Sequence, residues 1–130
     1  MPPDNAAPIA AGADVAFPLD GPASGTNIVR LSGTEFALLD PGIYLVQFQV
    51  SADEAGQLVL TLNGAELPYT VVGRATGTSQ LVGMALVETD VATSVLTVRN
   101  PADATTALTV TPSAGGTEPA SAHLVIAQLQ

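Results

Sequence analysis

The sequence predicts an all-β domain built as an antiparallel sandwich or barrel, and three observations carry this prediction. Twelve glycines and ten prolines divide the 130 residues into short segments rich in Val, Leu, Ile and Thr, a composition that favours strands separated by turns. Helix signals are nearly absent, because the one alanine-rich stretch, residues 6–16, is broken by Pro8 and Gly12. Apolar residues make up 47% of the chain and charged residues 12%, which is sufficient for one domain with a sizeable core.

Ten segments are expected to form strands, most of them five to nine residues long. They are residues 15–19, 28–31, 35–39, 43–51, 57–63, 65–72, 79–88, 94–100, 107–111 and 121–129. Residues 1–14 precede the first of them and are expected to form a flexible segment that joins the folded domain, residues 15–130, to an upstream region. These first residues lack the basic and long apolar stretches of a signal peptide.

Two turns between these segments have a clear local cause. Asn63-Gly64 separates two apolar runs, and this dipeptide accepts the positive φ angles that a type I′ hairpin needs. Asp40-Pro41-Gly42 precedes the longest clean strand; proline fixes one φ angle there, and glycine leaves the next one free.

The charge balance limits the partners of the domain. Twelve acids face only three bases, all of them arginine, so that the net charge is −9. This charge repels a phosphate backbone and anionic lipid surfaces, so we expect no binding of nucleic acid and no insertion into membranes. The absence of cysteine excludes disulfides, thiolate zinc sites and thiol nucleophiles.

Two of the expected strands lack a face suited to water. In residues 43–50, one face is wholly apolar, and the other combines apolar and amide side chains, namely Ile43, Leu45, Gln47 and Gln49. In residues 121–129, one face carries Leu124 and Ile126, and the other carries His123, Val125, Ala127 and Leu129. A sandwich ordinarily leaves the outer face of each sheet to water. We therefore expect another subunit to cover the second face.

No constellation of residues points to an enzyme. His123 is the only histidine, it lies within an expected strand, and no G-x-S-x-G motif accompanies it. The best acid pairs for a cation are Asp53 with Glu54 and Glu88 with Asp90, and neither has the spacing of a calcium loop. We predict a domain without catalytic residues, bound metal or cofactor.

Several blocks of the sequence resemble the C1q and tumour-necrosis-factor superfamily. Four blocks follow in the order and spacing of that superfamily: the strand of residues 15–17, the block from Phe36 through Asp40-Pro41-Gly42 to Val50, the L-x-L-N-G-x-x-x-P hairpin within residues 58–68, and the last strand, residues 122–129. The chain is most similar to the C-terminal domains of BclA-type collagen-like glycoproteins of the bacterial spore exosporium.

The resemblance implies a jelly-roll sandwich of about ten strands that assembles as a homotrimer. It implies a structural role, as the trimerisation domain and outer knob of a collagen-like surface glycoprotein, with a collagen-like region upstream and a location on the spore or cell surface. It also implies that the two strand faces that are not suited to water meet at the trimer interface. The expected interface residues are Ile43, Leu45, Gln47, Gln49, Gln80, Val82, Met84, His123, Val125, Ala127 and Leu129.

An alternative function is a binding head, either an adhesin or a module that recognises a host receptor or a glycan. Such a head would act through the surface loops of residues 53–56, 73–78 and 103–106. A monomeric carbohydrate-binding domain is a third interpretation, and the absence of tryptophan disfavours it.

Overall fold

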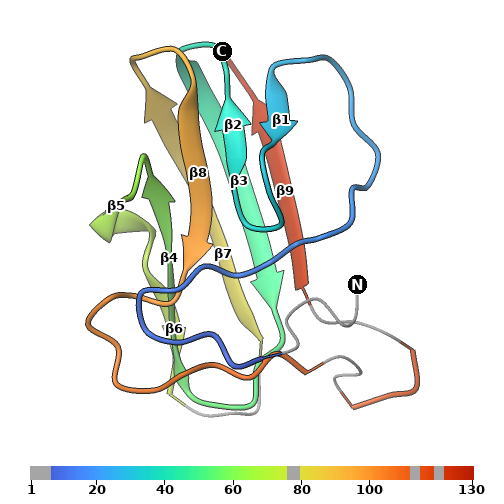
Figure 1. Cartoon of the computed structure of the whole chain (residues 1–130), viewed down its shortest axis with the longest axis vertical. Helices are drawn as coiled ribbons and strands as arrows, with labels where there is room; N and C mark the ends of the chain where they lie inside the picture. The colour runs from blue at the N-terminus through green and yellow to red at the C-terminus, as the bar shows by residue number, and fades with distance from the viewer. Residues whose placement is uncertain (1–6, 76–79, 112–114, 119–121) are drawn as a thin grey trace.

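Two antiparallel β-sheets stacked face to face make up the protein (Figure 1). The computed structural model describes residues 7–75, 80–111, 115–118 and 122–130. Side chains from both sheets fill the space between them with an apolar core. The prediction of an all-β antiparallel sandwich is therefore confirmed.

The first sheet has the strand order β1-β2-β8-β4-β5, and β6 also pairs with β4. Its strands are β1 (Ile28–Arg30), β2 (Phe36–Leu38), β4 (Gly56–Leu62), β5 (Ala65–Glu66), β6 (Val72–Arg74) and β8 (Ser94–Arg99). The second sheet has the order β7-β3-β9. It consists of β3 (Gly42–Val50), β7 (Leu81–Thr89) and β9 (Ala122–Gln128).

β3 is the central strand of the second sheet. Its register with β7 runs from Gly42 opposite Thr89 to Val50 opposite Leu81, and its register with β9 places Val50 opposite Ala122. Alternate side chains along β3 point into the core, where they are almost completely buried: Tyr44, Val46, Phe48 and Val50. The other side chains of β3 consequently point away from the core.

The expected strand of residues 65–72 is interrupted. Pro68 begins a short 3₁₀ helix, Pro68–Thr70, which separates β5 from β6. Both short strands pair with β4, β5 near its end and β6 near its start. Proline has no N–H to donate to a neighbouring strand, so continuous pairing ends there.

Two other expected strands, residues 15–19 and 107–111, are not strands. The N–H of Val15 donates to Val98 in the first sheet, whereas that of Phe17 donates to Gly33. In residues 107–111 the pairing is limited to isolated bridges, Leu108 with Ile9 and Val110 with Ala52. In both segments the pairing partner changes after one or two residues, so no continuous ladder forms.

The folded part of the chain begins upstream of the expected boundary at residue 15. Ile9 is buried and exchanges two backbone hydrogen bonds with Leu108. Asp14 accepts hydrogen bonds from the side chains of Thr97 (3.1 Å) and Arg99 (2.8 Å) in β8. These contacts place residues 9–17 against the first sheet, and Figure 1 shows this segment crossing in front of it.

The two glycine turns have different physical causes. Asn63 and Gly64 both have positive φ angles, 52° and 84°, as the predicted type I′ hairpin requires. Gly42 instead provides space, because a Cβ atom there would lie 2.0 Å from the carbonyl oxygen of Gln130. Glycine was expected at position 42 for its free φ angle. The structure shows that it is needed because the backbone at Gln130 passes close to the backbone at Gly42.

A polar cluster fixes the start of β3 inside the sandwich. The Tyr44 hydroxyl donates to the carbonyl of Asp40 (2.6 Å) and accepts from the amide of Asn27 (2.7 Å). The side-chain oxygen of Asn27 accepts the N–H of Asp40 (2.6 Å), and its amide also donates to Gln128 of β9. A buried hydroxyl is costly unless it is hydrogen-bonded, so the cluster holds the turn before β3 in place.

Gly83 of β7 leaves room for the ring of Phe48, its cross-strand neighbour. A Cβ atom at position 83 would lie 2.3 Å from Cζ of that ring. We predict that Gly83→Ala lowers the free energy of unfolding by about 1–3 kcal/mol, the usual cost of overpacking a core. Urea denaturation measures this change. Gly33→Ala is the control, because no heavy atom lies within 4 Å of a Cβ at that position, and equal stability of the two variants would contradict the prediction.

Candidate functional site

The side of the three-stranded sheet that points away from the core forms an almost uncharged surface, which we call the outer face. All three strands contribute alternate residues to it. These are Val82, Met84, Leu86 and Glu88 of β7, Ile43, Leu45, Gln47 and Gln49 of β3, and His123, Val125 and Ala127 of β9.

The strand registers arrange these side chains in rows across the sheet. One row is Leu86, Leu45 and Ala127, and the next is Met84, Gln47 and Val125. Each row therefore carries apolar side chains on both sides of the central strand. In the third row, Gln49 lies between Val82 and His123, and at the opposite end of the face Glu88 pairs with Ile43.

Large apolar side chains on the outer face are open to solvent. Met84 is 66% exposed, Val125 55% and Leu86 54%. Exposed apolar side chains that gather in one patch are typical of interaction surfaces. The chain has a net charge of −9, yet Glu88 is the one carboxylate among the residues of the face and lies at its end. Depletion of charge at the centre is typical of interface cores.

Nine of the eleven residues expected at the subunit interface lie on the outer face: Ile43, Leu45, Gln47, Gln49, Val82, Met84, His123, Val125 and Ala127. Leu129 follows the end of β9 and is 58% exposed. Gln80 precedes β7, and its side-chain amide bonds the hydroxyl of Ser51 at 3.3 Å. The structure thus brings side chains from three separate segments of the sequence together on one surface.

Sequence reasoning missed two residues of this face, Leu86 and Glu88. Both continue the alternation that starts at Val82 and Met84, and the pairing of Leu86 with Leu45 fixes this register. The alternation of residues 81–89 is a signal that could have found them.

The outer face offers contact area rather than reactive groups. Its imidazole, His123, is exposed and lies opposite the Gln49 amide. Within the described residues, no three His, Cys, Asp or Glu side chains come close enough to hold a metal ion. No helix in the part of the chain that the structure describes is long and apolar enough to cross a membrane.

Comparison with known proteins found no matching family model and no curated protein with significant sequence similarity.

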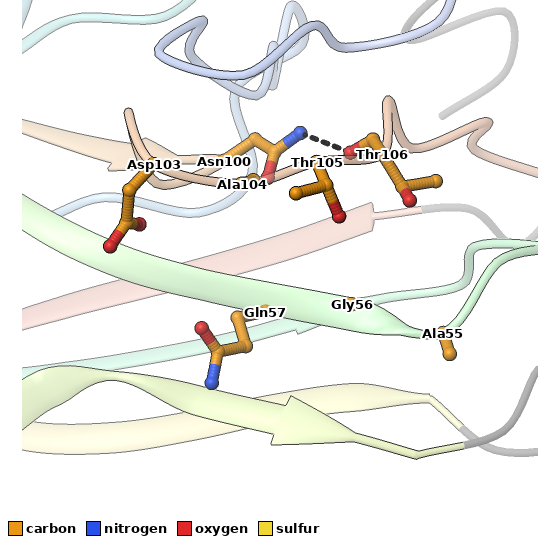
Figure 2. A pocket seen from close by; sticks show the side chains of 8 residues that line it. All are labelled: Ala55, Gly56, Gln57, Asn100, Asp103, Ala104, Thr105 and Thr106. Atoms are coloured by element: carbon orange, nitrogen blue, oxygen red, sulfur yellow. Dashed lines mark hydrogen bonds between the residues drawn. The ribbon is translucent and has the colours of Figure 1, made fainter.

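A second surface feature is a polar cavity of about 290 Å³ between the start of β4 and the loop after β8 (Figure 2). Its lining residues are Ala55, Gly56, Gln57, Asn100, Asp103, Ala104, Thr105 and Thr106. Two of the three loops expected in a binding head, residues 53–56 and 103–106, thus meet at one cavity. The third loop, residues 73–78, includes residues 76–78, which lie outside the described residues.

Hydrogen bonds anchor the two segments that line this cavity. Asn100 is 1% exposed, and its amide donates to the carbonyls of Ile9 (2.9 Å) and Thr106 (3.1 Å; Figure 2). Next to Ala55, which lines the cavity, the Glu54 carboxylate accepts the N–H and the hydroxyl of Thr109, each at 2.7 Å. Glu54, considered above as a cation ligand, thus anchors its loop to residue 109.

The hydrogen bonds that anchor Glu54 also change the pKa of its carboxyl group. Desolvation alone would raise the pKa, but the hydrogen bonds from Thr109 and the charge of Arg74 outweigh it, so the pKa lies below its ordinary value. A carboxylate whose folded-state pKa is lowered stabilises the fold above its unfolded-state pKa. It loses that contribution as the pH falls through the folded-state pKa.

We therefore predict that Glu54→Gln lowers the Tm at neutral pH and that the difference shrinks as the pH falls through the folded-state pKa of Glu54, because wild-type Glu54 then becomes protonated. Thermal denaturation monitored by circular dichroism over this pH range measures the effect. The exposed Glu118 provides a control, Glu118→Gln. A difference for Glu54→Gln that is the same at every pH would contradict this account of Glu54.

Proposed function

We propose that this domain is the non-enzymatic trimerisation and outer-knob domain of a collagen-like surface glycoprotein. In this proposal the fold is a jelly roll of the C1q/TNF type, and the partners of the chain are two further copies of itself and an upstream collagen-like region. The number of three copies, the collagen-like region and the location on a spore exosporium or cell surface come from the sequence resemblance described above. The observation that carries self-association is the exposed, nearly uncharged outer face.

The path of the chain supports the jelly-roll fold. From β2 to β3 to β4 the chain changes sheet at each connection, and it does so again from β6 through β7 and β8 to β9. β5 and β6 pair with successive parts of the same β4 strand and so act as one interrupted strand. Alternation between two sheets is how the Greek keys of a jelly roll wrap around each other.

The contrast between the two sheets supports self-association. The first sheet is covered on its outer side, where Val59 and Thr61 are fully buried and Asp14 reaches Thr97 and Arg99. The outer face of the second sheet instead leaves Met84 and Val125 open to solvent. Burial of these side chains against another copy of the chain removes apolar surface from water, which is the main driving force of association.

Matched valine variants test this proposal. Val125 on the outer face and Val91 in the turn after β7 are both 55% exposed. We predict that Val125→Asp dissociates the assembly, because it places three carboxylates in an apolar interface, whereas Val91→Asp leaves it intact. Light scattering on a size-exclusion column reads the mass directly. An assembly that survives Val125→Asp would contradict the proposed interface.

The polar cavity favours one second candidate function, a glycan-binding head. Its lining includes the hydroxyl-bearing Thr105 and Thr106 and the carboxylate-bearing Asp103, side chains that suit hydrogen bonding to the hydroxyls of a saccharide.

A glycan array tests this second function. We predict that any saccharide retained by the wild-type domain is lost from the double variant Asp103→Asn, Thr105→Ala and is retained by Val91→Asp. Binding that survives the double variant, or an array without a retained saccharide, would contradict the second function.

A further inference from the structure

The sheet face by itself is small for a stable interface. Three strands about 4.8 Å apart, with up to nine residues of about 3.4 Å each, span about 14 by 30 Å, or about 400 Å² in projection. Side chains give the face more accessible surface than its projection, but in the proposed trimer each copy contacts two others, and a stable interface buries about 800 Å² of accessible surface on each partner. We therefore expect the contact between copies to continue past one edge of this sheet.

At the edge formed by β7, the apolar surface continues onto Tyr69. The Tyr69 side chain is 65% exposed, and its hydroxyl donates to the carbonyl of Leu86 at 2.6 Å. This hydrogen bond holds the ring against the outer edge of β7, beside one of the exposed residues of the outer face. The polar atom of the ring is thereby paired within its own chain, and the exposed carbon surface remains.

The segment around Tyr69 is uncharged. Residues 67–73 contain no acid or base, and Val71 within it is 39% exposed. The opposite edge is different, because β9 is linked there to Asn27 and β1 through Gln128. On that side, the exposed Leu19 and Leu31 adjoin in sequence the ion pair of Asp20 with Arg30 (2.7 Å). Glu66 and Arg74 flank the uncharged segment, and Glu88 lies near the end of β7, but Tyr69 and Val71 have no charged residue next to them in sequence, unlike Leu19 and Leu31. Charge depletion at the centre of an interface therefore favours the β7 edge.

We propose that the contact surface between copies of this chain extends from the outer face around the edge of β7 onto Tyr69 and Val71, with Tyr69 as its aromatic anchor. This inference rests on the self-association proposed above. Tyrosine is among the residues that contribute most to interfaces. Because Tyr69 also blocks the Leu86 carbonyl, this edge contacts the second copy through side chains rather than by adding a strand.

Tyrosine labelling in the wild-type protein tests the inference without a change at Tyr69. The other tyrosine, Tyr44, is fully buried, so a tyrosine-specific nitrating reagent reports on Tyr69. We expect slow modification of Tyr69 in the assembled wild-type protein and fast modification in Val125→Asp, with the modified residue identified by mass spectrometry. Equal rates in an assembled wild type and a dissociated Val125→Asp would overturn the role of Tyr69.

A variant series provides a second readout. We expect Tyr69→Ser to raise the chain concentration at which the assembly dissociates by about tenfold or more, and Leu31→Ser at the opposite edge to leave it unchanged. Val71→Ser, expected to act in the same direction as Tyr69→Ser, serves if Tyr69→Ser does not fold. If Val125→Asp dissociates the assembly but the Tyr69 and Val71 variants do not, the self-association stands and this inference fails. A monomeric wild-type chain would overturn both.

Discussion

Hydrogen bonding of β3 along both of its edges is the constraint on which the rest of the structure depends. Because neighbouring residues of a strand point to opposite sides, the register with β7 and β9 decides which side chains enter the core and which form the outer face. A slip of one residue would expose Tyr44 and Phe48 and bury Gln47. The core and the candidate contact surface are therefore two consequences of the same pairing, and Gly83 and the Tyr44 hydrogen bonds both help to hold it.

The outer sides of the two sheets differ in what covers them. Residues 9–17 lie against the first sheet, and Asp14 supplies acceptors to Thr97 and Arg99 there. In the described residues the second sheet has no such cover, although it carries more exposed apolar side chains than a solvated sheet face ordinarily does. In the proposed assembly, a second copy of the chain would supply an apolar partner without a dedicated covering segment. The polar cavity lies near the first sheet, so the proposed ligand site and the proposed self-association of the second sheet would use separate surfaces.

Much of this arrangement could be predicted from the sequence, because it follows from local rules. The alternation of side-chain types along the sequence indicated the strands β3 and β9. The dipeptide Asn63-Gly64 indicated the hairpin, because a type I′ turn needs two positive φ angles. Contacts between distant segments could not be predicted in this way. The two hydrogen-bond partners of residues 15–17, Val98 and Gly33, and the placement of Tyr69 against β7 depend on how the whole chain folds. The expected strand of residues 65–72 ran through Pro68, although proline has no N–H to donate to a neighbouring strand. Only the structure shows that β5 and β6 continue on the same neighbour.

The mass of the wild-type chain in solution tests the central claim, that the outer face is covered by other copies of the chain, most directly. Multi-angle light scattering on a size-exclusion column, at several chain concentrations, gives this mass independently of shape. The account predicts three times the 13.0 kDa of one chain, about 39 kDa, because the proposed assembly is a trimer. A mass of 13.0 kDa at every concentration would contradict it, since the outer face would then remain exposed to water.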